Sequence, residues 1–199
     1  MKSVIEMIIK DVVLSIYPGL MASFVFAVLF MTVYNYALKM GVKNIIREWT
    51  DCFKEDKEFR FKFLFAMYIF LVLTRTVFFR NYYGSPIANV LGYWHLYTEE
   101  GKINTELFEN FVLFVPLTFC IFLAYPRIIF RRKRKSFFVV IFKGFEISFA
   151  ASLFIEIIQV FFKLGTFQLS DLFFNTLGGL FGSVLYYIYK KLLHKRKKH

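Results

Sequence analysis

The chain has 199 residues, of which 58% are apolar and 22% aromatic, and its formal net charge is +12. An apolar share of roughly 45 to 50% is usual for soluble domains, so the composition excludes a soluble globular domain. We therefore expect an all-α fold, a polytopic helical bundle in a membrane, with residues 1–199 forming a single membrane domain.

Five stretches are long and apolar enough to cross a bilayer, which takes about 20 residues. In chain order they cover about residues 12–38, 61–79, 108–126, 137–162 and 169–189. The first stretch is too long for a signal-peptide core and lacks a cleavage pattern, so we expect it to be retained. Residues 1–17 carry apolar side chains at helical spacing before Pro18, which predicts an interfacial helix on the outer surface, with a re-entrant half-span near residues 3–17 as the alternative.

Basic residues alternate between the connections. Residues 1–11, the four connections and the tail hold in turn 2, 7, 2, 6, 1 and 6 lysines and arginines. The positive-inside rule therefore predicts an N-terminus outside and a basic tail, residues 190–199, in the cytoplasm. The run RRKRK is interpreted as a topology determinant that touches anionic lipid heads, so membrane lipids, and no nucleic acid, are the expected partners.

Polar residues recur on one face of each of the last two spans. Three- and four-residue steps place on one helix face Ser148, Ser152, Glu156 and Gln159. The last span has a second such face with Asp171, Asn175, Gly178 and Gly182. Gly178 and Gly182 form a small-xxx-small pair, which predicts close helix packing.

The link between these two spans is short, so the helices are expected to be antiparallel. Counted from the middle of the link near Thr166, Gln159 is level with Asp171, and Glu156 is level with Asn175. We expect these two pairs to face each other in the outer half of the membrane.

Other polar residues are expected at the same depth. Arg75 lies near the outer end of the second span, and Glu109 and Asn110 open the third. A charged residue at the centre of a span costs about 2.5 to 3.5 kcal/mol on insertion scales, so Arg75 is the expected counter-ion of Glu156 or Asp171. The alternative is a purely structural role, in which amide groups bridge helices at about 0.6 kcal/mol each.

The last two spans resemble the VanZ-like family, whose motif reads Glu-x-x-Gln, a short turn, then Asp-x-x-x-Asn-x-x-Gly. The matching residues are Glu156, Gln159, Gly165, Thr166, Phe167, Asp171, Asn175 and Gly178, and the stretch NFVLFVP at residues 110–116 looks like a second family feature. Together they define a VanZ-like core at residues 105–185. Gln168 and Thr118 depart from the pattern, since the family often has Asp and Gly there.

The resemblance implies a multi-pass protein of the bacterial cytoplasmic membrane that is linked to lipoglycopeptide resistance, chiefly to teicoplanin. We hypothesise a non-enzymatic protein with a polar pocket in the outer leaflet. Its ligand would be the antibiotic or a lipid-linked cell-wall precursor, bound by Arg75, Asn110, Glu156, Gln159, Asp171 and Asn175. The oligomeric state stays open.

Two other functions are weighed. In an intramembrane hydrolase of lipid-linked phosphates, Glu156 or Asp171 would act as general base with His95 from the outer connection, but no nucleophile elbow or zinc-binding pair is found. In a flippase, polar residues would line both halves of the membrane, whereas on the cytoplasmic side we find only Lys143, expected to snorkel beside Glu146. The cysteines and histidines are scattered, so no metal or cofactor is predicted.

Overall fold

The computed structural model describes residues 2–37, 45–78, 80–95, 97, 103–130 and 136–196. These residues form helices and no strand, in the order α1 (Lys2–Ala37), α2 (Ile45–Glu55), α3 (Lys57–Leu73), the π-helical turn η2 (Thr74–Phe78), α4 (Glu106–Ala124), α5 (Pro126–Ile129), α6 (Phe137–Phe162) and α7 (Leu169–Arg196). Five of the described helices are long and apolar enough to cross a membrane: α1, α3 continued by η2, α4, α6 and α7. The prediction of an all-helical chain with five such helices is confirmed.

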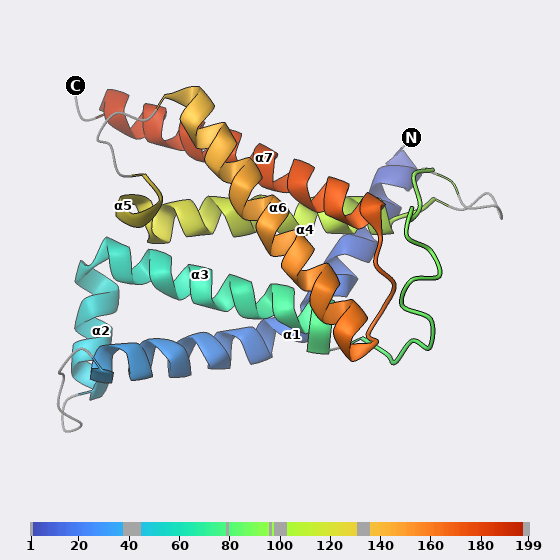
Figure 1. Cartoon of the computed structure of the whole chain (residues 1–199). Helices are drawn as coiled ribbons and strands as arrows, with labels where there is room; N and C mark the ends of the chain where they lie inside the picture. Colours follow the sequence, from blue (N-terminus) through green and yellow to red (C-terminus); the bar gives the residue numbers. More distant parts are fainter. Residues whose placement is uncertain are drawn as a thin grey trace.

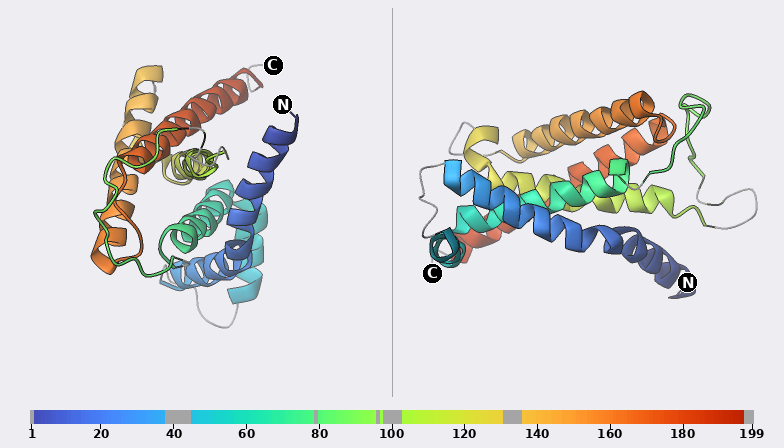
Figure 2. Two further views of the ribbon diagram at one scale, coloured as in Figure 1. Left: turned by 90° about the vertical axis from the view of Figure 1, so that its right-hand side faces the viewer. Right: turned by 90° about the horizontal axis from the view of Figure 1, so that it is seen from below.

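The first helix differs from the prediction. Residues 2–17 do not form a separate helix, because one helix runs from Lys2 to Ala37 with Pro18 inside it. Proline removes a backbone donor and bends a helix, and the left view of Figure 2 shows α1 bent along its course. Gly19 marks a close approach to η2, since a Cβ there would meet the side chain of Thr74. The interfacial position of residues 1–17 stays a prediction.

The chain reverses direction at each connection, so the connections gather at two ends (Figure 1). The N-terminus, residues 80–95 and the α6–α7 link lie at one end, and α2, α5 and the C-terminal part of α7 lie at the other. We refer to the first as the outer end and to the second as the inner end, after the orientation that the charge pattern predicts. Which end faces the cytoplasm stays a prediction.

Helix α4 lies at the centre of the bundle. It packs most extensively against α7 and α3, while α6 packs on α7 and α1 on α3. Where α4 and α7 approach the inner end, the core is aromatic, and the ring centroids of Phe122 and Tyr186 lie 5.2 Å apart. Both of these side chains are almost completely buried.

Two glycines allow α4 and α7 to run very close together. A Cβ on Gly178 would collide with the carbonyl oxygen of Phe111, and a Cβ on Gly182 with that of Val115. A side chain at either position would push the two helices apart. Small residues at such contacts let membrane helices approach closely. The helix that the two glycines contact belongs to the same chain.

Helix α2 closes the inner end of the α1–α3 pair (Figure 1). The ring of Trp49 meets that of Phe63 edge-on at 5.8 Å. The Arg60 guanidinium donates to the carbonyl oxygens of Phe53 and Lys54 at 2.8 and 2.7 Å, where the last turn of α2 leaves acceptors without helical partners. This charged segment is thus a helix with one face packed on the bundle.

Candidate functional site

The polar faces of α6 and α7 meet in a single register. Four pairs, spaced four residues apart on both antiparallel helices, face each other: Gly144 with Ser183, Ser148 with Gly179, Ser152 with Asn175, and Glu156 with Asp171. In the first two pairs a glycine makes room for a serine, because a Cβ on the glycine would collide with the serine side chain. These small pairs bring the two backbones close enough for the next two pairs to meet.

The two pairs nearest the outer end are polar. The Nδ2 of Asn175 donates a hydrogen bond to Ser152 Oγ at 2.9 Å. One turn further out, Glu156 and Asp171 lie close enough for their charges to interact. Glu156 is 1% exposed and Asp171 is 5% exposed. Two carboxyl groups therefore share one buried helix contact. We call them the carboxyl pair.

The expected pairing of Gln159 with Asp171 and of Glu156 with Asn175 is wrong by about one helical turn. The reason lies in residues 166–168, which are not helical. A non-helical chain can advance about 3.3 Å per residue, against 1.5 Å in a helix, so the chain regains the level of Glu156 before α7 begins. The backbone N–H of Gln168 accordingly donates to Glu156 Oε2 at 3.0 Å.

The guanidinium group near the carboxyl pair belongs to Arg80. Its charge interacts with both Glu156 and Asp171, and its Nη1 would lie 3.5 Å from a Cβ on Gly165. Arg75 instead forms an ion pair with Glu109 at 2.5 Å. The prediction that Arg75 is the counter-ion of Glu156 or Asp171 is therefore wrong.

The π-helical turn η2 accounts for this exchange of roles. A π-turn holds more residues per turn than an α-helix, so side chains at the end of α3 point in directions that α-helical spacing does not predict. A signal for Arg80 was present in the sequence, because the second connection holds two basic residues, of which Arg80 directly adjoins the second span. A cation next to a membrane face that carries few cations is a candidate partner for buried carboxylates.

Gln159 has its amide group engaged within the protein. Its Nε2 donates to the carbonyl oxygen of Thr76 in η2 at 2.8 Å, and the side chain is 3% exposed. This bond ties the outer end of α6 to the outer end of α3. Gln159 thus fixes α6, which carries Glu156, against η2, which ends two residues before Arg80.

The outer connection is fastened along the α6–α7 link. Three backbone hydrogen bonds of 2.7 to 2.9 Å join them: Tyr83 N–H to Lys163 O, Phe167 N–H to Pro86 O, and Leu169 N–H to Val90 O. The N–H of Tyr93 also donates to Ser170 Oγ at 3.2 Å. The left view of Figure 2 looks onto this end and shows residues 80–95 passing beside the ends of α6 and α7. Residues 80–95 therefore cover the link residue that binds Glu156.

Several buried polar atoms toward the outer end of the bundle have no hydrogen-bond partner among the described residues. They are the acceptors Asp171 Oδ1 and Asn175 Oδ1 and the donors Asn110 Nδ2 and Arg80 Nε. A buried polar group without a partner costs about 1 to 3 kcal/mol. The site thus holds donors and acceptors that a polar ligand group can satisfy.

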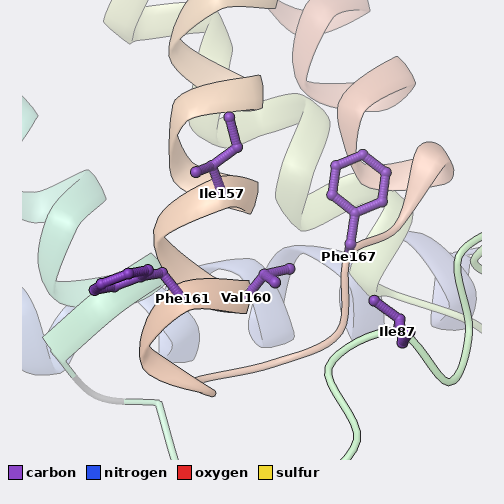
Figure 3. A pocket seen from close by; sticks show the side chains of 5 residues that line it. All are labelled: Ile87, Ile157, Val160, Phe161 and Phe167. Atoms are coloured by element: carbon purple, nitrogen blue, oxygen red, sulfur yellow. The ribbon is translucent and has the colours of Figure 1, made fainter.

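An apolar hollow of about 320 Å³ opens at the outer end of α6. Figure 3 shows its walls, formed by Ile157, Val160 and Phe161 of α6, Phe167 of the link and Ile87 of the outer connection. Ile157 follows Glu156 in the chain and Phe167 precedes Gln168, so the hollow and the carboxyl pair use neighbouring faces of the same segments. The lining of this hollow is apolar, unlike that of the polar pocket that we expected, and the buried Glu156 and Asp171 are not part of it.

The chain matches the model of a known protein family. A family model for VanZ/LLP1 matches residues 14–190. The chain is a member of the VanZ/LLP1 family. The suspected VanZ-like resemblance is thereby confirmed, and at the family level VanZ proteins are associated with antibiotic resistance. No curated protein and no solved structure matches the chain significantly.

The VanZ/LLP1 match is longer than the resemblance at residues 105–185 and includes α3, η2 with Arg75, and Arg80. The residues of the motif turn also take part in this VanZ/LLP1 site. Gly165 lies against Arg80 and Gln159, and Thr166 Oγ1 accepts from Gln168 Nε2 at 2.8 Å. Gln168 thus serves the site through its backbone N–H and a neutral amide.

Two other residues of the VanZ/LLP1 chain that the sequence singled out, His95 and Lys143, form no hydrogen bond with the carboxyl pair. His95 is exposed at the end of the described stretch of the outer connection. Lys143 pairs with Glu146 at 2.6 Å on the surface of α6. Within the described ranges, no three His, Cys, Asp or Glu side chains group closely enough to hold a metal ion.

Proposed function

We propose that this VanZ/LLP1 protein lowers susceptibility to lipoglycopeptides, teicoplanin above all, by binding an amphipathic envelope molecule. The family's association with antibiotic resistance supports the biological role. The binding would take place in the outer leaflet of the bacterial cytoplasmic membrane. The distribution of Lys and Arg supports this orientation, with the N-terminus outside and the basic tail in the cytoplasm.

The observation that carries the proposal is that the carboxyl pair and the apolar hollow occupy adjoining residues at the outer end of the bundle, since Ile157 of the hollow follows Glu156. An amphipathic molecule needs an apolar surface for its tail and polar groups for its head. The hollow beside Ile157 supplies the first, and the unpaired atoms of Asp171, Asn175, Asn110 and Arg80 supply the second.

Roles within the site follow from these contacts. Arg80 takes the part first expected of Arg75 as the cation of the site, because its charge reaches the carboxyl pair. Gln159 positions α6 through its bond to Thr76. Two ligands share the required chemistry, namely the antibiotic itself and a lipid-linked cell-wall precursor.

The proposal is tested by antibiotic susceptibility. Expression in a susceptible bacterium should raise the teicoplanin concentration that stops growth, and Glu156→Gln or Asp171→Asn should return it to the level of the empty vector. These substitutions keep the side-chain shape and remove the charge. Glu146→Gln is the matched control, because Glu146 is exposed on the same helix and pairs with Lys143. Full protection by the two site variants at equal protein level would contradict the proposal.

One observation favours a second candidate, an intramembrane hydrolase of lipid-linked phosphates. Two interacting carboxyl groups, such as Glu156 and Asp171, are an arrangement that acid–base catalysis uses. Purified protein would then release inorganic phosphate from a polyprenyl phosphate, and Glu156→Gln would stop the release. Binding of the lipid without turnover would exclude this candidate.

A further inference from the structure

We infer that the apolar hollow holds the chain of a phosphate-bearing lipid whose phosphate group binds Lys163 at the outer end of α6. The inference rests on the proposed function and deepens it, because it names the chemical class of the amphipathic molecule. Three features carry it: the backbone conformation of Lys163, the surroundings of its ammonium group, and the position of the hollow along α6.

Lys163 ends α6 in the left-handed conformation, with φ 54° and ψ 43°. Among the described residues other than glycine, it is the one with a positive φ. Glycine is the usual residue at this position after a helix, because a Cβ makes the left-handed conformation less favourable. A side chain kept at a strained position indicates a role that glycine cannot fill.

The ammonium group of Lys163 is exposed and lies 5.9 Å from the centre of the Tyr82 ring. It forms no ion pair with any described residue. The described acidic groups at this end of α4, α6 and α7 are engaged or directed elsewhere: Glu109 binds Arg75, Glu156 accepts from the Gln168 N–H, and Asp171 is buried against α6, with Glu106 close enough to interact with it. The ammonium group is therefore available to an external anion at the level of the lipid headgroups.

The hollow lies at the depth that a lipid tail would occupy below this group. Its α6 residues, Ile157, Val160 and Phe161, precede Lys163 by two to six residues, which places them about 3 to 9 Å further into the membrane. Phe161 is 78% exposed and Ile87 is 71% exposed, so the hollow opens toward lipid. Beyond it, the exposed Phe154 continues the apolar surface of α6.

A headgroup cation above a chain-sized apolar hollow is complementary to one kind of molecule. A soluble phosphate would leave the hollow unused, and a neutral lipid would leave Lys163 without its anion. A phosphate-bearing lipid satisfies both, and a lipid-linked cell-wall precursor belongs to this class.

Binding to the full-length protein in detergent tests the inference with three matched compounds: oleoyl lysophosphatidic acid, monoolein and glycerol 3-phosphate. Native mass spectrometry should show saturable one-to-one binding of lysophosphatidic acid. Monoolein, which lacks the phosphate, should bind about tenfold more weakly, as expected for loss of a charge-assisted contact of ~1.4 kcal/mol. Glycerol 3-phosphate should not bind measurably. Equal affinity for the first two compounds would overturn the inference.

Variants separate the role of Lys163 from a structural one. Lys163→Gly relieves the backbone conformation, so its melting temperature should not fall, yet it should bind lysophosphatidic acid no better than monoolein. Val160→Trp fills the hollow and should weaken both lipids, while Val139→Trp, the same change at an exposed position near the inner end of α6, should bind like the wild type. Unchanged preference for phosphate in Lys163→Gly would refute the lysine's role.

The two proposals fail in different ways. Teicoplanin protection that depends on Glu156 and Asp171 but survives both Lys163→Gly and Val160→Trp would remove the lipid site and leave the proposed function. Saturable, phosphate-dependent lipid binding without any protection by the wild type would remove the proposed function and leave the lipid site.

Discussion

Arg75 and Arg80 lie five residues apart and interact with different acids. Arg75 binds Glu109 through a contact in which the two side chains are 34% and 14% exposed, whereas Arg80 interacts with Glu156 and Asp171. A double-mutant cycle with Arg75→Gln and Glu109→Gln should give a coupling of roughly 0.5 to 3 kcal/mol, as found for residues in contact. Thermal unfolding in detergent measures it. The same cycle between Arg75 and Glu156 should give a coupling near zero, and the reverse result would restore the pairing that the sequence predicted.

At the residue scale, the sequence predicted which side chains converge but not which ones touch. Helical spacing correctly places Ser152 and Glu156 on one face of α6 and Asp171 and Asn175 on one face of α7. The partner of each residue depends on the non-helical residues 166–168 and on the π-turn before Arg80. Neither has a periodic signature in the sequence. The predicted pairing of α6 with α7 was therefore wrong by one helical turn, and Arg80 was not predicted as the cation near the two acids.

At the scale of elements, the α4–α7 contact depends on the absence of side chains at two positions. Gly178→Ala should destabilise the protein by about 1 to 3 kcal/mol, the usual cost of overpacking, because its Cβ would collide with the carbonyl oxygen of Phe111. Gly84→Ala is the control, since no atom lies within 4 Å of a Cβ there. A melting temperature in detergent that stays equal for the two variants would show that the helices can separate without cost.

The contact between the outer connection and α7 also depends on a glycine. Gly92 has a φ of 74°, and a Cβ on it would collide with Ser170. The first residues of α7 pack against this turn, where Ser170 accepts from the Tyr93 N–H. Gly92→Ala should therefore loosen residues 80–95 while the helices stay intact. Hydrogen exchange should rise at the amides of Tyr83, Phe167 and Leu169, which bond across this contact. Slow exchange there, as in Gly84→Ala, would mean that the contact tolerates the added methyl group.

Element boundaries were predicted best where composition changes sharply. The apolar stretch at residues 137–162 coincides with α6, and the last span begins with α7 at Leu169. The first helix was divided at Pro18 because proline usually ends a helix in water. In α1 the helix continues through Pro18, as membrane helices can when neighbouring groups compensate for the lost backbone bond.

At the scale of the whole molecule, every proposed role requires that the carboxyl pair face the outside of the cell. Cysteine labelling in intact cells tests this. The two native cysteines are first replaced, by Cys52→Ser and Cys120→Ala. One new cysteine is then introduced at either end, at Ser85 or at Lys54, both of which are exposed. A membrane-impermeant maleimide should label Ser85→Cys in intact cells but label Lys54→Cys only after lysis, because basic connections are retained in the cytoplasm. The opposite pattern would put Glu156, Asp171 and the hollow in the inner leaflet, where an antibiotic acting on the outer surface could not reach them.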